Sequence, residues 1–277
     1  MIKMIIVQII GGLGNQMFQY ALAKKLKFKL GYTVKLDITA YDSYKLHNYC
    51  LDVFKLDIPV ATLKEIEICK NNNILDEPQF NYWDKIYDIQ ENTYIRGYWQ
   101  SEKYFLDIRK DLLNDFSVRR DLSAKTLNAI KIFNEKRNTV SIHIRRGDYV
   151  ANPLTLKIHG ICSDEYYKQA VNYFNNLFEK PFFVIFSDDI NWVKENLICK
   201  LNIDNYYCID FNDITRNYED ILLMSKCNHN IIANSSFSWW GAWLNNNEKK
   251  QVVAPKNWFN EATYNSETIV PEQWLRF

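Results

Sequence analysis

The sequence predicts an α/β fold made of two domains with a cleft between them. Residues 5–10 are apolar except for Gln8, which is typical of a strand buried on both faces of a sheet. Residues 182–186 form a second such run in the other half of the chain. Strand-like and helix-like segments alternate after each run, which predicts parallel sheets covered by helices on both faces. With 277 residues, the chain is long enough for two such domains.

The first domain begins with a β-α-β unit. A glycine turn at 11–14 follows the first strand. Apolar residues then recur at every fourth position, which indicates a helix: Phe18, Leu22, Leu26 and Leu30. Gly31 stands where a helix C-cap is expected, and residues 34–38 alternate as a second strand. The crossover of this unit is expected to be right-handed.

The middle of the chain has a weaker pattern. Residues 40–95 are rich in Tyr, Asn and Lys with little hydrophobic period, so we expect short helices and loops there. Residues 94–99 favour another strand, and residues 101–133 look mostly helical. We expect the domain boundary near 120–138 and divide the chain into 1–130 and 131–277.

The second domain repeats the alternation of strands and helices. We expect its strands at 139–145, 181–187, 206–211, 230–233 and 251–254. Helices are expected at 164–178, 188–197, 218–227 and 236–244. The order of these segments again predicts a parallel sheet.

The composition argues against several classes of protein. The formal net charge is +1 and no long Lys or Arg block occurs, so a nucleic-acid partner has no support. The six cysteines form no CxxC pair and have no histidine at metal-ligand spacing, so we expect no metal. No apolar stretch reaches the roughly 18–20 residues that span a bilayer. We read residues 1–10 as a strand rather than a signal peptide, and we expect a cytoplasmic protein. A peripheral position at the inner membrane face stays open.

The glycine turn at 11–16 is the first candidate site, because such a turn lets an anion or a sugar approach the backbone. Gly12 and Gly14 begin the dinucleotide-binding pattern GxGxxG, but Met17 stands where its third glycine belongs. Asp37, at the end of the second strand, would suit a ribose contact. An NAD(P)-dependent oxidoreductase therefore stays an alternative, and so does a tight turn without any ligand.

The second candidate is the segment SIHIRRGD. Side chains alternate between the faces of a strand, so His143 and Arg145 point to the same side. Both can reach a ligand at the carboxyl end of the strand, where open α/β sheets bind ligands. The fork of an arginine suits a diphosphate, since it donates two parallel hydrogen bonds. Arg146 is expected to point the other way, and its expected role near the site is an ion pair with a carboxylate such as Asp148.

The third candidate is the pair Asp188 and Asp189, directly after the most apolar strand. A carboxylate there can accept hydrogen bonds from the N1–H and the exocyclic amine of guanine. One of the two can instead cap the next helix. A metal site is the weaker alternative, because no further acidic cluster lies nearby in the sequence.

The fourth candidate is NSSFSWWGAW at 234–243, which joins a strand to a helix. Ser235 or Ser236 is a natural N-cap there. The free N–H groups and the positive end of the helix would bind phosphate. We expect the tryptophans of this helix to lie in the core.

Together these segments resemble the bacterial α-1,2-fucosyltransferases of glycosyltransferase family 11. The resemblance rests on five motifs in order along nearly the whole chain: GGLGNQMFQYA at 11–21, GYWQSEKYF at 97–105, HIRRGDYV at 143–150, FSDD at 186–189 and NSSFSWWGAWL at 234–244. The HxRRxD pattern is shared more widely with α-1,6-fucosyltransferases and protein O-fucosyltransferases. The GGLGNQ and SSFSWWGAW segments narrow the resemblance to family 11.

The resemblance implies a GT-B-like fold, in which two Rossmann-type domains face each other across a cleft. Residues 1–130 would form the acceptor side, and residues 131–277 would bind GDP-fucose. The implied reaction is inverting and metal-independent, with GDP-fucose as co-substrate and no other cofactor. It would move L-fucose to the 2-hydroxyl of a galactose-terminated oligosaccharide or glycolipid, in surface-glycan or O-antigen synthesis.

Residue roles follow from the same resemblance. Arg145 would grip the β-phosphate of GDP and Asn15 would face the fucose and the acceptor, so these are the expected catalytic residues. The other donor-binding residues are His143 at the nucleoside, Asp188 at guanine, Ser236 and the Phe237 backbone at phosphate, and Gly14 in the glycine turn.

The general base is left open among Asp148, Asp37 and Asp42. A non-catalytic sugar-binding protein built on the same fold stays a third alternative, and it predicts ligand binding without turnover.

Overall fold

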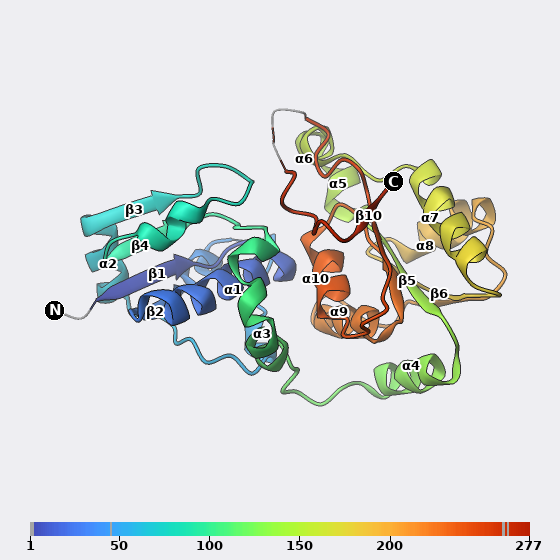
Figure 1. The fold of residues 1–277 in the computed structure, drawn as a ribbon, viewed down its shortest axis with the longest axis horizontal. Coiled ribbons are helices and arrows are strands. Elements are labelled where there is room, and N and C mark those ends of the chain that lie inside the picture. The colour runs from blue at the N-terminus through green and yellow to red at the C-terminus, as the bar shows by residue number, and fades with distance from the viewer. Residues whose placement is uncertain (1–2, 45, 262–263, 265) are drawn as a thin grey trace. The chain divides into compact units, whose positions relative to one another are not determined.

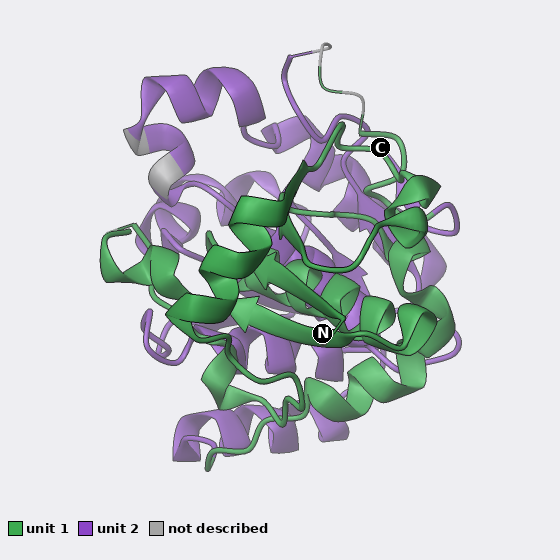
Figure 2. Ribbon diagram, turned by 90° about the vertical axis from the view of Figure 1, so that its left-hand side faces the viewer, with its two compact units in different colours: residues 1–121, 264–271 green, residues 122–263, 272–277 purple. Residues whose placement is uncertain are grey.

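The computed structural model describes residues 3–44, 46–261, 264 and 266–277, without the side chains of Asp148 and Ala151. The chain folds into two compact units, which Figure 2 colours separately. Unit 1 comprises residues 1–121 and 264–271, and unit 2 comprises residues 122–263 and 272–277. Each unit is therefore built from two separate stretches of the chain. The assignment of 1–130 and 131–277 to two functional domains stays a prediction.

Unit 1 contains a four-stranded parallel sheet with the order β2-β1-β4-β3, and the arrows of β1, β3 and β4 run in one direction in Figure 1. The strands are β1 (Met4–Gln8), β2 (Thr33–Asp37), β3 (Asn73–Asp76) and β4 (Thr93–Arg96). β1 is almost wholly apolar because it is a central strand with buried faces. The strand expected at 94–99 ends at Arg96, because Gly97 and Trp99 have φ angles of 142° and 57°, which no strand accommodates.

Two helices pack on this sheet. α1 (Leu13–Leu30) contacts β1 and β2, and it ends at Gly31, whose φ of 66° confirms the predicted C-cap. α2 (Leu63–Asn72) contacts β1 and β4 and begins with a capping box between Thr62 and Glu65. The rest of the middle region is loops and the short 3-10 helices η1 (Thr39–Asp42), η2 (Leu51–Val53) and η3 (Asp84–Asp88).

The expectation of helix over 101–133 is only partly right. The segment consists of η4 (Glu102–Tyr104), η5 (Leu106–Ile108), α3 (Arg109–Asp115) and α4 (Ala124–Glu135). The stretch between α3 and α4 is extended instead, because the N–H of Arg119 donates to the carbonyl of Val53 and a β-bridge joins Phe54 to Val118. These long-range hydrogen bonds outweigh the local helix propensity.

Unit 2 contains a six-stranded parallel sheet with the order β10-β9-β8-β5-β6-β7. The strands are β5 (Thr139–Ile144), β6 (Phe182–Ser187), β7 (Tyr206–Ile209), β8 (His229–Ile231), β9 (Val252–Ala254) and β10 (Leu275–Arg276). The first five of these strands agree with the sequence within a few residues. β10 has only two residues, so its sequence carries no periodic signal.

Six helices follow α4 in unit 2. They are α5 (Gly147–Ala151), α6 (Pro153–His159), α7 (Asp164–Leu177), α8 (Ile190–Asn196), α9 (Asn217–Lys226) and α10 (Ser236–Leu244). α5 and α6 were not expected from the sequence. Both are short, and no residue of α6 is buried, so neither shows a hydrophobic period.

Each sheet has a point at which strands that follow one another in the chain lie on opposite sides of a central strand. In unit 2 the chain moves outward from β5 to β6 and β7, and then returns to β8 on the other side of β5. In unit 1, β2 lies on one side of β1 and β4 lies on the other. Open α/β sheets bind ligands at such switch points, outside the carboxyl ends of the strands. The loops after β5 and β8, and those after β1 and β4, are therefore the places to search for function.

Candidate functional site

β5 brings His143 and Arg145 to the switch point of unit 2. All six residues of β5 are buried, because the strand pairs with β6 on one side and β8 on the other. The centroid of the His143 ring lies 5.6 Å from that of Phe237, which belongs to α10. Burial, together with the charge of Arg145, lowers the pKa of His143 to about 3, so the imidazole is neutral at physiological pH. Its buried Nδ1 has no hydrogen-bond partner among the described residues.

Asp188 orients the guanidinium of Arg145. It follows β6, the neighbour of β5, and its Oδ2 lies 2.8 Å from Nη1 of Arg145. Its Oδ1 accepts a hydrogen bond of 2.9 Å from the backbone N–H of Arg146. The side chains of Arg145 and Asp188 are 22% and 25% exposed, so solvent and ligands can reach the pair. The geometry thus presents a preoriented cation at the carboxyl edge of the sheet.

The loop after β5 fits closely around this ion pair. A Cβ atom on Gly147 would lie 2.4 Å from Oδ2 of Asp188, so any side chain there would displace the carboxylate. The Cζ atom of Arg145 lies 5.3 Å from the centroid of the Tyr149 ring. A glycine at position 147 is therefore needed for the contact between Asp188 and Arg145.

Arg146 is held by a different set of contacts. Its Cζ lies 3.3 Å from the centroid of the Trp192 ring, and its Nε lies 3.4 Å from Oδ2 of Asp189. Asp189 also caps α8, since its Oδ1 accepts a hydrogen bond of 3.3 Å from the N–H of Trp192. The expectation that one aspartate of the pair caps the next helix is confirmed. The carboxylate that pairs with Arg146 is Asp189, and the side chain of Asp148 lies outside the described residues.

The N-terminus of α10 lies at the same switch point, after β8. Ser235 is the N-cap, and its Oγ accepts a hydrogen bond of 3.4 Å from the N–H of Phe237. Ser236 is the first helical residue, and both Ser236 and Phe237 are partly exposed. The side chain of Asn234 anchors the loop, since its Nδ2 donates a hydrogen bond of 2.7 Å to the carbonyl of His159.

The three tryptophans of α10 lie in the core, as expected. Trp239 and Trp240 are 0% exposed and Trp243 is 2% exposed. They pack α10 against the core and are not part of its exposed N-terminal end.

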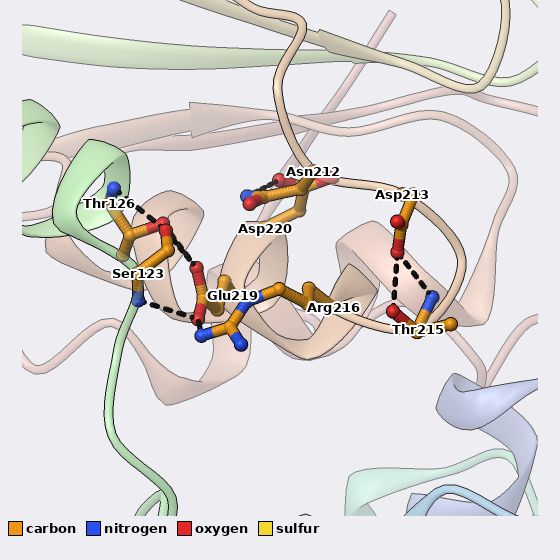
Figure 3. Close-up of polar contacts among 8 residues, drawn as sticks. All are labelled: Ser123, Thr126, Asn212, Asp213, Thr215, Arg216, Glu219 and Asp220. Carbon is orange, nitrogen blue, oxygen red and sulfur yellow. Dashed lines mark hydrogen bonds and ion pairs between the residues drawn. The ribbon is translucent and has the colours of Figure 1, made fainter.

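A carboxyl group that the sequence analysis did not single out lies at the start of α9. Asp220 accepts a hydrogen bond of 2.7 Å from Nδ2 of Asn212, and Figure 3 shows this pair beside Glu219. Burial raises the pKa of Asp220 to about 7. The sequence signal was available, because α9 follows β7 and so begins at the same carboxyl edge as the other candidates.

Glu219, the neighbour of Asp220, has a structural role. It is fully buried, and it accepts hydrogen bonds from the N–H and Oγ of Ser123 at 3.1 Å and 2.8 Å. It also contacts Oγ1 of Thr126 and the guanidinium of Arg216, as Figure 3 shows. Burial opposes its ionisation, but these hydrogen bonds outweigh burial and lower its pKa. Glu219 therefore joins the start of α4 to α9.

The remaining two predicted site residues lie in unit 1. Gly14 is buried in the first turn of α1, and Asn15 follows it and is partly exposed. Oδ1 of Asn15 accepts a hydrogen bond of 2.7 Å from Nε2 of Gln100, which lies in the loop after β4. The structure thus brings His143, Arg145, Asp188, Ser236 and Phe237 together in unit 2, and it places Gly14 and Asn15 at the other sheet's switch point.

Asp37 is unsuited to the role of a general base. It is 1% exposed, and it accepts hydrogen bonds from the hydroxyl of Tyr94 at 2.6 Å and from the N–H of Thr39 at 2.8 Å. Burial opposes its ionisation, but these hydrogen bonds and the charge of Lys70 lower its pKa. Asp42 is exposed and stays a candidate.

No group of three or more His, Cys, Asp or Glu side chains in the described part of the chain is placed to hold a metal ion. No helix among the described residues has the length and apolar character to cross a membrane.

Several known glycosyltransferases are similar in sequence to this chain. An α-1,2-colitosyltransferase of Escherichia coli is 35% identical over 99% of each chain. The O-antigen biosynthesis glycosyltransferase WbnK of Escherichia coli is 34% identical over 96% of this chain and 97% of the relative. A galactoside α-(1,2)-fucosyltransferase 2 of Hylobates lar is 28% identical over 86% of this chain and 68% of the relative.

A solved structure of Arabidopsis thaliana FUT1 in complex with GDP shares the fold. It aligns with a TM-score of 0.52 and 10% identity, over 99% of this chain and 76% of FUT1. This likeness, together with the two parallel-sheet units, identifies the fold as GT-B-like. The model of glycosyl transferase family 11 matches residues 2–277. The chain therefore belongs to glycosyl transferase family 11.

Proposed function

We propose that the chain transfers L-fucose from GDP-β-L-fucose to the 2-hydroxyl of a galactoside, forming an α-1,2 linkage with inversion. The observation that carries the proposal is the Arg145 guanidinium, which Asp188 orients at the switch point of the unit 2 sheet. The paired oxygens of a diphosphate match the fork of an arginine. The similarity to a colitosyl- and a fucosyltransferase that both form α-1,2 linkages supports the linkage, and the name of the Hylobates lar relative supports a galactoside acceptor.

The mechanism is electrostatic. The acceptor hydroxyl attacks the anomeric carbon on the side opposite the leaving GDP, so a β-linked donor gives an α-linked product. The proton of the hydroxyl passes to the general base, for which Asp42 and Asp148 stay open. Negative charge grows on the β-phosphate as the bond to the sugar breaks. Arg145 and the backbone N–H groups of Ser236 and Phe237, at the positive end of α10, stabilise that charge in the transition state. No metal ion is required for this step, and full activity in excess EDTA is expected.

The nucleoside is assigned to the residues around β5 and β6. His143 is neutral and packs beside Phe237, so it contacts the nucleoside without adding charge. The guanine contact of Asp188 stays a prediction. Both of its oxygens already accept from Arg145 and Arg146, so Asp220 is a second carboxyl that could accept the N–H groups of guanine.

Comparison of GDP with inosine diphosphate, which lacks the 2-amino group of guanine, separates the two aspartates. If the aspartate binds guanine, its change to asparagine removes the protein's preference for GDP over inosine diphosphate. If the aspartate only orients Arg145, the variant loses affinity for both nucleotides equally. Asp188→Asn and Asp220→Asn should be measured side by side by calorimetry.

Asn15 and Gly14 are assigned to the sugar side of the reaction. Asn15 carries an amide that can hydrogen-bond to sugar hydroxyls, and Gly14, which is buried beside it in the first turn of α1, stays a predicted donor-binding residue. The acceptor is a galactose-terminated oligosaccharide or glycolipid of the kind used in surface-glycan or O-antigen synthesis. We place the reaction in the cytoplasm, with peripheral contact at the inner membrane face when the acceptor is a glycolipid.

A second donor sugar has a specific observation in its favour. The relative that is 35% identical is a colitosyltransferase, and colitose is fucose without the 3-hydroxyl group. A site that hydrogen-bonds the 3-hydroxyl rejects colitose strongly, because its polar groups would stay unpaired. The two GDP-sugars should therefore give very different values of kcat/KM.

The decisive experiment measures GDP release from GDP-fucose and GDP-colitose with a panel of galactosides, in excess EDTA, with mass spectrometry of the product. Turnover with GDP-fucose and a galactoside supports the proposal. Turnover only with GDP-colitose would mean that colitose is the transferred sugar, while the proposed mechanism stays the same. GDP binding without turnover favours the non-catalytic sugar-binding alternative. Binding of NAD(P) without GDP binding would return the oxidoreductase alternative, which family membership now argues against.

A further inference from the structure

The switch point of unit 1 contains a second network of side chains, built mainly from amides. It joins the loop after β1 to the loop after β4, two strands that are adjacent in the sheet. Gln19 bridges the loops, since its Oε1 accepts from the N–H of Ile10 at 3.0 Å and its Nε2 donates to the carbonyl of Gly97 at 2.9 Å. Gln100 makes the second link, through its hydrogen bond of 2.7 Å to Oδ1 of Asn15. The orientation of Asn15 therefore depends on the conformation of the loop 97–100.

That loop has an unfavourable backbone conformation. Gly97 has a φ of 142°, and Trp99 has a φ of 57°, in the left-handed region that residues other than glycine rarely adopt. Trp99 is 0% exposed, and its Nε1 has no hydrogen-bond partner among the described residues. Such a conformation persists only where surrounding contacts enforce it.

Glu77 supplies contacts that enforce it. Glu77 follows β3, the neighbour of β4, and its Oε2 accepts a hydrogen bond of 2.7 Å from the N–H of Tyr98. Its Oε1 accepts a hydrogen bond of 2.9 Å from the N–H of Trp99. Two consecutive backbone N–H groups thus point at one carboxylate, in the manner of an anion-binding nest.

Gly97 allows this close approach. A Cβ atom on Gly97 would lie 2.4 Å from Cβ of Glu77 and 2.8 Å from its Oε2. The glycine and the carboxylate therefore fit as a pair. On the other loop, a Cβ atom on Gly11 would lie 2.8 Å from Nδ2 of Asn15, so Asn15 is also packed against a position that needs a glycine.

We propose that Glu77 is a positioning residue for sugar transfer, which holds the loop 97–100 so that Gln100 orients Asn15. The inference rests on the proposed function, in which Asn15 contacts the sugars. Glu77 acts through Tyr98 and Trp99 and needs no contact with substrate.

The environment of Glu77 adds a pH readout. Burial raises its pKa to about 7, although the two N–H groups oppose the shift. The titratable groups that interact electrostatically with it are the phenols of Tyr98 and Tyr104, and burial raises the pKa of both, so they stay neutral near pH 7. Protonation of Glu77 on acidification weakens its two hydrogen bonds and releases the loop. We therefore expect kcat to fall as the pH drops below about 7.

The test compares Glu77→Gln with Asp76→Asn. Asp76 is the matched control, because it is the neighbouring carboxylate and its exposed ion pair with Arg96 is outside the network. Glutamine keeps the size of Glu77 but turns an NH₂ group toward one of the two N–H donors. We expect Glu77→Gln to lower kcat about fivefold to tenfold, because it acts through Asn15 and costs no more than the loss of one hydrogen bond from that residue. It should leave the Kd of GDP unchanged and remove the acidic limb of the pH profile, while Asp76→Asn behaves as wild type.

A second variant keeps the test valid if Glu77→Gln does not fold. Gln100→Ala leaves the carboxylate in place and removes only the last link to Asn15. We expect the same loss of kcat and the same loss of the acidic limb of the pH profile in Gln100→Ala alone, because Glu77 then no longer reaches Asn15. Where Glu77→Gln does fold, we expect no further loss when both changes are combined, because they act along one path. Wild-type kcat in Gln100→Ala, or additive losses in the double variant, overturns the proposal. If the wild-type protein itself shows no turnover, the proposed function fails and not the role of Glu77.

Discussion

The two switch points of this molecule both lie at the carboxyl ends of parallel strands, but their side chains differ in charge. In unit 2, the loops after β5 and β6 present a charged pair, Arg145 with Asp188, beside the N-terminus of α10. In unit 1, the loops after β1 and β4 present amides, with Asn15 and Gln100 in direct contact. The only carboxylate in that second network, among the described residues, is Glu77, which binds backbone N–H groups.

Under the proposed function, this difference would suit the two switch points to different parts of a transfer reaction. A nucleoside diphosphate carries charge that increases as the bond breaks, so its site needs fixed positive groups. Sugar hydroxyls are neutral, and amides can both donate to them and accept from them. We therefore expect substitutions in unit 2 to affect nucleotide binding and chemistry together, and substitutions in unit 1 to affect chemistry alone.

The largest expected effect follows from loss of the cation in unit 2. Arg145→Ala should lower kcat by about 10²–10³-fold, the usual cost of one electrostatic donor in a transition state. Arg145→Lys should fail as well, because lysine cannot form the two parallel hydrogen bonds. Steady-state kinetics with Arg120→Ala as control checks this, since Arg120 forms an exposed ion pair with Asp52. Near-wild-type activity of Arg145→Ala would remove Arg145 from the mechanism.

The next effect concerns the partner of that cation. Asp188→Asn removes the charge that orients Arg145 and leaves a weaker acceptor for the Arg146 N–H. We expect kcat/KM to fall about 10–10²-fold, in line with the loss of a charged hydrogen bond. The Kd of GDP should rise with it. Unchanged GDP affinity would show that Arg145 keeps its orientation without Asp188.

A smaller effect is expected at the amide network of unit 1. Asn15→Asp keeps an oxygen that accepts from Gln100, but it loses the NH₂ group and gains a charge. We expect kcat to fall about fivefold to tenfold while the Kd of GDP stays the same, because one hydrogen bond is worth about 1–1.5 kcal/mol. Loss of GDP affinity in this variant would break the comparison between the two units.

The smallest effect is on stability. Burial raises the pKa of Asp220 in unit 2 to about 7, whereas an unfolded aspartate titrates near 4. Between these values the folded chain holds more protons than the unfolded chain, so stability falls as the pH rises from about 4 to 7. Asp220→Asn should flatten this dependence by about 1–2 kcal/mol. Urea unfolding at pH 5 and pH 8 measures it, and equal slopes in both proteins would contradict the burial of Asp220.

The sequence was informative where the physics is local. The apolar run of β1 and that of β6 predicted central strands, since burial on both faces leaves no polar positions. Gly31 and Ser235 marked a helix end and a helix start, because capping involves only a few neighbouring residues. Placing Arg145 at a strand end required only the alternation of side chains along a strand.

The sequence was less informative where contacts join distant segments. The ion pair of Arg146 with Asp189 and the contacts of Glu77 have no signal in spacing. Residues 264–271 belong to unit 1 although they follow unit 2 in the chain. Each of these features depends on which strands lie side by side.

By itself, the sequence determined the alternating α/β architecture, the four candidate loops and the membership of a transferase family, because periodicity, turn residues and motifs are properties of short segments. Only the tertiary structure decided that Asp188 orients Arg145 and that Glu77 supports the loop beside Asn15. The strand orders β8-β5-β6 and β1-β4-β3 bring these loops together, and strand order is set by the packing of the whole sheet rather than by any one segment.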